Sequence, residues 1–156
     1  PTWVQVLQGV STRYWRWLID DPRPSGLVEI GRLVMARGWQ PQFNASMGCT
    51  IGVDDRTEIS ELEDGGEIAE ERPRRRVVTF SLYHLSEDEA VSVLLYMQRT
   101  LGTWGEVLFC MDPTSTRYVQ PLSMWCRFQQ VQPITKASCV QYTNPVALIE
   151  IAREST

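Results

Sequence analysis

The sequence has little of what catalysis usually needs. It contains a single histidine, His84, among 156 residues, and it has no G-x-S-x-G, P-loop or G-x-G-x-x-G motif. A catalytic histidine works with a nucleophile and an orienting acid around it, whereas a lone histidine at the end of a strand is usually structural. The sequence therefore predicts that the protein is not an enzyme and uses no cofactor.

Cysteine patterns, lysines and long apolar runs are also scarce. Cys49, Cys110, Cys126 and Cys139 show no C-x-x-C spacing, so they are typical neither of a zinc site nor of a dense disulfide framework. We expect buried thiols in a reducing compartment. Lys136 is the only lysine, and the many arginines suit forked contacts to carboxylates at interfaces. No apolar run approaches the length of a membrane span, and the chain's start lacks a secretory pattern.

The residues that the sequence does contain predict a mainly β protein, and its length is that of one domain. The net charge of −4 and the pI near 5.0 argue against nucleic-acid specificity and against binding to an anionic membrane. Alternating apolar and polar residues, punctuated by proline and glycine, indicate extended segments. The expected strands cover residues 14–19, 27–34, 43–53, 77–83, 105–111, 122–131 and 146–152.

One helix is expected at about 87–101. Ser86 and Glu89 form a capping box, in which each side chain can bond the other residue's backbone N–H. Gly102 follows at the position where a helix commonly ends. The apolar residues between these signals recur at helical spacing and predict one buried stripe. The stripe consists of Ala90, Val91, Leu94, Met97 and Leu101.

Residues 54–71 hold nine acids and one base, Arg56. Asp64-Gly65 inside this segment is a hairpin-turn signal, because the central positions of such turns favour positive φ. We therefore predict a protruding β-hairpin arm at about 54–76. Calcium is a weaker reading of Asp54, Asp55 and Glu58, because the EF-hand spacing is absent.

Opposite charges follow one another around this arm and predict pairing between subunits, which sets register and partner choice. The expected interface residues are Glu61, Glu63, Glu67, Glu70, Arg72, Arg74, Arg75 and Arg76. Five tryptophans are expected to be core or interface anchors, although stacking on sugars would make the chain a carbohydrate-binding module. They are Trp15, Trp17, Trp39, Trp104 and Trp125. A hydrolase is the third reading, and it requires two arm carboxylates facing one cleft.

Several strings resemble a pattern found in tail proteins of long, flexible-tailed bacteriophages. The first is Arg13-Tyr14-Trp15-Arg16-Trp17-Leu18-Ile19-Asp20-Asp21-Pro22, followed by Gly26-Leu27-Val28-Glu29-Ile30-Gly31-Arg32-Leu33. The resemblance continues through Arg72-Pro73-Arg74, Asp88-Glu89, Gln98-Arg99, Gly105-Glu106-Val107-Leu108-Phe109 and Asp112-Pro113. It covers residues 11 to 151, and its specificity lies in the order and spacing of these strings.

The resemblance implies a virion structural protein of the tail tip, similar to distal tail or baseplate subunits. Such subunits form a ring that links the tail tube to the host-recognition apparatus. The implied fold is a single β-sandwich-type domain over 1–156, flanked by the helix, with 1–34 as the last strands or the remnant of a jelly-roll module. The implied partners are copies of the chain, sixfold before threefold, together with tail-tube, tape-measure, hub or receptor-binding proteins. The protein would be made in the host cytoplasm, and a head–tail joining or tail-completion role fits equally.

Overall fold

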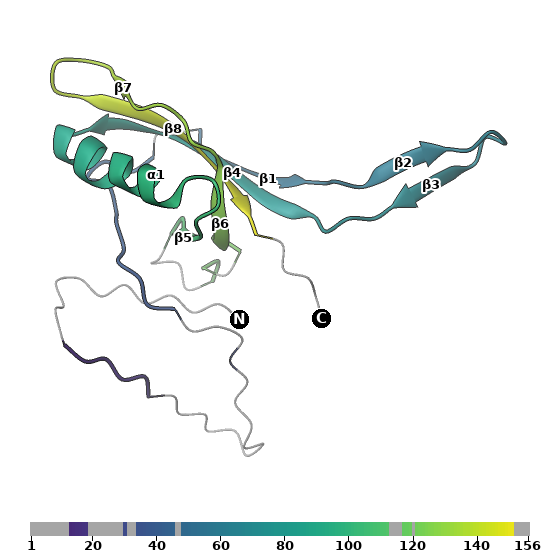
Figure 1. Ribbon diagram of the computed structural model, residues 1–156, viewed down its shortest axis with the longest axis horizontal. Coiled ribbons are helices and arrows are strands. Elements are labelled where there is room, and N and C mark those ends of the chain that lie inside the picture. Colours follow the sequence, from purple (N-terminus) through teal and green to yellow (C-terminus); the bar gives the residue numbers. More distant parts are fainter. Residues whose placement is uncertain are drawn as a thin grey trace.

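The computed structural model describes residues 13–18, 30, 34–45, 48–112, 117–119 and 121–151. These residues form a body of sheet and helix from which a long hairpin projects (Figure 1). Within them lie eight strands and one helix, so the predicted mainly β, α+β class is confirmed. The two layers of the body, sheet and helix, are consistent with the predicted sandwich.

A six-stranded antiparallel sheet forms the body. In spatial order its strands are β1 (Thr50–Asp54), β4 (Arg75–Leu85), β8 (Tyr142–Glu150), β6 (Ser123–Gln130) and β5 (Val107–Cys110), and the short β7 (Thr135–Lys136) pairs with β8. Alternation along β4 places Val78 and Leu82 in the core and leaves Thr79 and Tyr83 exposed on the other face. This pattern is the one that predicted the strand.

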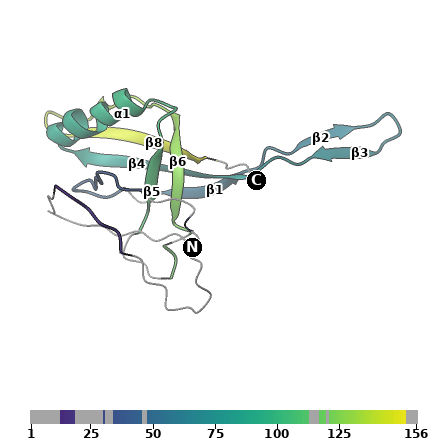
Figure 2. The ribbon, with the colours of Figure 1, turned by 60° about the horizontal axis from the view of Figure 1, so that its bottom comes forward.

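The helix lies across one face of the sheet, over β4 and β8, at the end away from the hairpin (Figure 2). Helical residues run from 87 to 101, as predicted; η1 (Glu89–Leu95) has π-helical hydrogen bonds and α1 (Tyr96–Leu101) is α-helical. The capping box is confirmed, because Glu89 N–H donates to Ser86 Oγ at 3.3 Å and Ser86 N–H donates to Glu89 Oε2 at 3.1 Å. The helix ends at Gly102, where φ is +54°.

The buried stripe of the helix differs in part from the prediction. Ala90 and Leu94 are buried, and so is Gln98, while Val91 faces solvent. The wider π turn places residues four to five apart on one face, which favours the Ala90–Leu94–Gln98 series and turns Val91 outward. The buried core joins the helix to the inner face of the sheet. Its members are Val78, Leu82, Leu85, Ala90, Leu94, Met124, Cys126, Phe128, Val146 and Leu148.

The cysteines are all free thiols, but only Cys126 is buried. Burial raises the pKa of its thiol to about 12, and its Sγ contacts the carbonyl oxygen of Val107 at 3.4 Å. Cys49 and Cys110 are partly buried, and Cys139 is exposed in the turn between β7 and β8. The expectation of four buried thiols is therefore wrong for Cys139, because a hairpin turn offers no apolar surroundings.

Three strands predicted in the first third of the chain have different outcomes. Residues 14–18 belong to no strand, and in the described part of the chain they have no β partner. An alternating pattern makes a strand only where a neighbour accepts its hydrogen bonds, so that prediction is wrong for these residues. The strand expected over 27–34 lies outside the described residues apart from Ile30 and Val34. The strand expected over 43–53 begins only at Thr50.

The last strand starts earlier than the sequence indicated. Residues 142–145 were expected to be loop because of Asn144-Pro145, yet β8 begins at Tyr142. The ladder between β8 and β6 ends at Ala147, and the ladder with β7 starts at Thr143. Pro145 therefore lies in the gap between these two neighbours, where a residue without an N–H is tolerated.

Candidate functional site: an acidic hairpin arm

The hairpin projects from the end of the sheet where β1 leads out and β4 returns (Figures 1 and 2). Its strands β2 (Glu58–Glu61) and β3 (Glu67–Glu70) pair antiparallel, and every residue of both strands is exposed. Ile59 and Ile68 are among the exposed side chains, at 66% and 54%. The predicted arm is therefore present, and it leaves apolar as well as acidic groups uncovered.

Asp64 and Gly65 form the tip of the arm. Gly65 N–H donates to the carbonyl of Leu62 at 3.0 Å, and Leu62 N–H donates to the carbonyl of Gly66 at 2.7 Å. Asp64 Oδ1 also accepts from Gly66 N–H at 3.0 Å. In this three-residue loop only Gly65 has a positive φ, of +82°, so the turn is not the two-residue type that needs positive φ at both positions.

Two pairs of glutamates stand directly opposite each other across the hairpin. Glu58 faces Glu70 near the base, and Glu61 faces Glu67 near the tip. Like charges at opposed positions destabilise a strand pair. Arg72 offsets the basal pair, because its guanidinium lies 3.0 Å from Glu58 and 3.7 Å from Glu70. In the described part of the chain no ion pair involves the glutamates of the tip pair.

The base of the arm is held by further arginine contacts. Arg74 Nε lies 3.0 Å from Asp55 Oδ2. The hydroxyl and N–H of Thr57 donate to Asp55 Oδ1 at 2.6 and 3.0 Å. These hydrogen bonds from Thr57, with Arg74 beside them, hold the pKa of Asp55 below 3.8, its ordinary value. The chain is therefore guided out of β1 and into the arm by a fixed local network.

A part-buried ion pair anchors the start of β4 to the end of β8. Arg76 Nη2 lies 2.5 Å from Glu150 Oε1, and the backbone N–H of Arg76 donates to Glu150 Oε2 at 3.0 Å. Arg76 Nη1 also donates to the carbonyl of Pro121 at 2.9 Å. The hydrogen bond from Arg76 lowers the pKa of Glu150 and raises that of Arg76. Both residues of this ion pair belong to the same chain, so the pair does not depend on a neighbouring subunit.

The structure separates the eight predicted interface residues into two groups. Glu61, Glu63 and Glu67 lie exposed at the tip, where a neighbour could reach them. Glu70 and the four arginines lie at the base, where Arg72, Arg74 and Arg76 already bind carboxylates of the same chain. The partners Asp55, Glu58 and Glu150 were not anticipated. Only the contact of Glu58 could have been predicted from the local sequence, because a hairpin centred on Asp64-Gly65 brings Glu58 close to residues 70–72.

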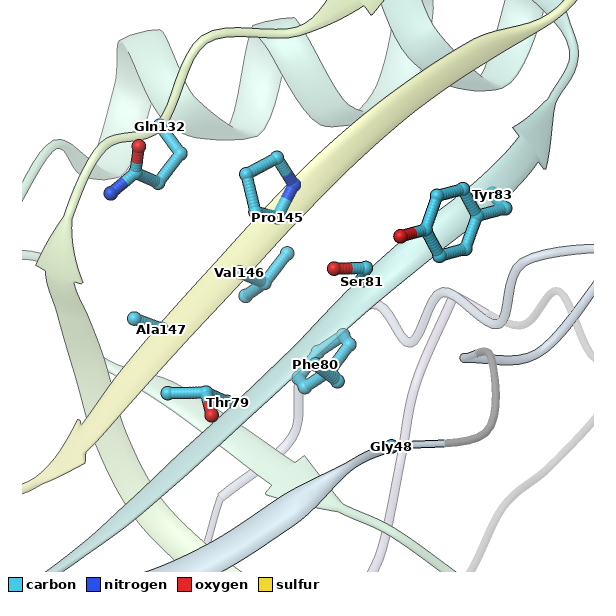
Figure 3. Close-up of a pocket in the computed structure, with 9 residues that line it drawn as sticks. All are labelled: Gly48, Thr79, Phe80, Ser81, Tyr83, Gln132, Pro145, Val146 and Ala147. Carbon is cyan, nitrogen blue, oxygen red and sulfur yellow. The ribbon is translucent and has the colours of Figure 1, made fainter.

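Both strands of the arm are exposed on either side, and a concavity of about 290 Å³ at its base has one carboxylate in its lining, Glu71, rather than the two facing carboxylates that a hydrolase would require. Another concavity, of about 420 Å³, lies on the sheet face opposite the helix, with Ser81 and Tyr83 of β4 beside Pro145 of β8 (Figure 3). Its lining is neutral, so it offers no acid–base pair. Among the described residues no group of His, Cys, Asp and Glu could hold a metal ion, and no helix is long and apolar enough to cross a membrane.

The tryptophans do not behave alike. Trp39 packs against the core, and Trp125 Nε1 donates to Glu106 Oε2 at 2.6 Å. Trp15 and Trp17 are exposed at 46% and 44%, and Trp104, after the helix, is exposed at 80%. The prediction of core or interface anchors is thus confirmed as core packing for Trp39 only.

No family model matches the chain, and no curated protein matches its sequence. Among solved structures, one chain of a structure described as "Virion of native gene transfer agent (GTA) particle" is similar in fold. The likeness covers 76% of this chain and 100% of that chain, with a TM-score of 0.50 and 19% sequence identity. At this identity it shows a shared fold.

Proposed function

We propose that the chain is a structural component of a phage virion, a ring-forming distal tail or baseplate subunit that links the tail tube to the host-recognition apparatus. Two observations outside the arm support this role. The ordered strings between residues 11 and 151 resemble tail proteins, and the fold is shared with a chain of a gene transfer agent virion. In this proposal residues 1–156 are one domain, and the protein contributes contacts rather than chemistry.

The arm is the observation that carries the proposal. A two-stranded hairpin is marginally stable in water, and this one has opposed glutamates and exposed isoleucines. Such a segment gains order when a second protein covers its apolar side chains and neutralises its carboxylates. The arm projects beyond the body (Figure 1), which supports a contact with a neighbouring subunit.

The test is deletion of Ile59–Glu70, compared with the full chain by light scattering and electron microscopy. We expect the wild type to form rings, sixfold before threefold, and the deletion variant to remain a folded monomer. Val140→Ser at the exposed β7–β8 turn is the matched control and should assemble normally. A deletion variant with unchanged oligomer mass would show that the arm does not mediate assembly.

Sugar binding is the second candidate, and the exposed indole of Trp104 favours it. Indole faces stack on sugar rings, so a module of this kind would bind glycans saturably and lose binding in Trp104→Ala. A ring subunit should show no saturable signal in the same calorimetric titration. Microscopy of the native particle would separate the tail tip from a head–tail joining position.

A further inference from the structure

The two faces of the arm are chemically different. Because side chains alternate along a strand, Ile59 and Glu61 of β2 share a face with Ala69 and Glu67 of β3. On this face, which we call the acidic arm face, an apolar pair is followed toward the tip by a pair of carboxylates. The step from Ile59 to Glu61 is two strand residues, or about 6.7 Å.

The helix carries a complementary arrangement on the side turned away from the sheet. Val91, Leu95 and Tyr96 are exposed there, Tyr96 at 68%. Arg99 is exposed one turn beyond Leu95, so the two side chains are neighbours on the helix surface. In the part of the chain that the structure describes, no ion pair involves Arg99. We call these four residues the outer helix face.

From this match we infer that the acidic arm face of one copy docks on the outer helix face of the next copy. Leu95 and Arg99 are four helical residues apart, or about 6 Å along the axis, close to the step on the arm. Ile59 can therefore cover Leu95 while Arg99 reaches between Glu61 and Glu67. The inference deepens the proposed function and rests on it, since it names the surface that receives the arm.

The basal pair of the arm shows that a guanidinium fits such a site. Arg72 lies within ion-pair distance of both Glu58 and Glu70, which face each other as Glu61 and Glu67 do. One forked cation between opposed carboxylates removes their repulsion and fixes their geometry. The tip pair is opposed across the same ladder but on the other face of the hairpin, where Arg99 of a neighbour would lie between its two carboxylates.

Charge distribution and shape both favour a second copy as the partner. The segment 54–71 holds nine acids and one base, which leaves ten acids and 14 basic residues in the rest of the chain. Four of these 14 are the arginines at the base of the arm, so residues outside 54–76 hold ten acids and ten basic residues, and the acidic tip of the arm meets a body without net negative charge. The arm projects from one end of the sheet and the helix lies at the other (Figures 1 and 2), so the contact joins different copies. Such head-to-tail contacts build rings or filaments.

Charge exchange tests this contact in the full-length chain. Glu61→Arg/Glu67→Arg and, separately, Arg99→Glu should each raise the half-assembly concentration at least about tenfold, the effect of losing a close charge pair. An equimolar mixture of the two variants should assemble again into a ring of even order such as the sixfold one, because alternating copies bring each arm to a helix of opposite charge. Ser60→Arg and Lys136→Glu, which lie off the two faces, are the controls. Circular dichroism verifies that every variant is folded.

The outcomes separate this inference from the proposed function. Wild-type chains that stay monomeric at every concentration would end the proposed function and this contact with it. Rings that form equally well from either reversed variant would overturn the contact alone. Where the wild-type ring has an even number of subunits, a mixture that stays as dissociated as its parts would also overturn the contact. Independently, Ile59→Cys and Leu95→Cys chains carrying Cys139→Ser should form a reducible cross-link when mixed under a mild oxidant, and its absence in assembled rings would count against the contact.

Discussion

Asn144 offers the sharpest test of how the body is held together. Its side chain is 1% exposed within β8, and its Nδ2 donates at 3.0 Å to the carbonyls of both Gln132 and Pro133. Gln98 from the helix donates to the same Gln132 carbonyl at 3.1 Å. Asn144 thus holds the segment after β6 against the sheet, beneath the helix. Asn144→Asp keeps the shape of the side chain and removes both donors.

The change places a carboxylate against two carbonyl oxygens in a buried site. An uncompensated buried charge costs about 3–5 kcal/mol in the free energy of unfolding, and we expect a loss of this size at pH 7. Burial raises the pKa of such a carboxyl, so its protonated form returns as the pH falls. The protonated acid can donate one hydrogen bond, and the deficit should then shrink to about 1–2 kcal/mol.

Urea unfolding followed by tryptophan fluorescence at pH 7 and pH 5 measures both values. Asn44→Asp, the same change at an exposed position, is the control and should alter the midpoint little at either pH. Equal midpoints for Asn144→Asp and wild type at pH 7 would refute the assigned role. A deficit that grew on acidification would refute the electrostatic reasoning.

Two further predictions concern the frame that carries the arm. Glu150→Gln should lower the free energy of unfolding at pH 7 by about 1–2 kcal/mol, because Arg76 loses a charged partner. The pKa of Glu150 is lowered from 4.5, so the deficit should disappear as the pH falls through the folded-state pKa; a deficit independent of pH in calorimetry would contradict this. Gly105→Ala should cost about 1–3 kcal/mol or more, as an overpacked contact. Its Cβ would lie 2.7 Å from Leu101 Cα and Cβ, and an unchanged melting temperature would show that the chain relaxes there freely.

A head-to-tail contact has consequences for the assembly. Each copy offers one arm and one helix, so every subunit in a closed ring makes two identical contacts and leaves no arm free. If the rotation from one copy to the next did not bring the last copy back to the first, the same contact would give open filaments. In the proposed ring, the angle at which the acidic arm face meets the outer helix face would set the number of subunits, and sixfold symmetry stays a prediction for microscopy.

Local signals in the sequence were sufficient for the helix and the arm. Ser86 and Glu89 mark a helix start by bonds between neighbours in the chain, and Gly102 marks its end through its own φ. Asp64-Gly65 similarly placed the tip of the arm. Such signals act over a few residues, so they do not depend on the rest of the fold.

Strand pairing and side-chain burial could not be predicted from such local signals. The strand predicted over residues 14–19 had the right alternation but no β partner in the described residues, whereas β8 was predicted four residues short because of Pro145. Whether an alternating segment, or one that contains proline, forms a strand depends on which other segment lies beside it and can pair with it. The buried roles of Gln98 and Asn144 were likewise missed, since nothing in their local sequence indicates that two carbonyls converge on them.

The sequence by itself determined where the chain turns, where its helix begins, and that a strongly acidic hairpin would leave the body. Only the tertiary structure decided which charges remain for a partner. Strand register brought Arg72 to Glu58 and Arg76 to Glu150, so most of the basic residues at the base of the arm are engaged within the chain, and Glu61 and Glu67 are left exposed. The physical reason is that an ion pair depends on distance in space, which register and sheet order set and sequence proximity does not.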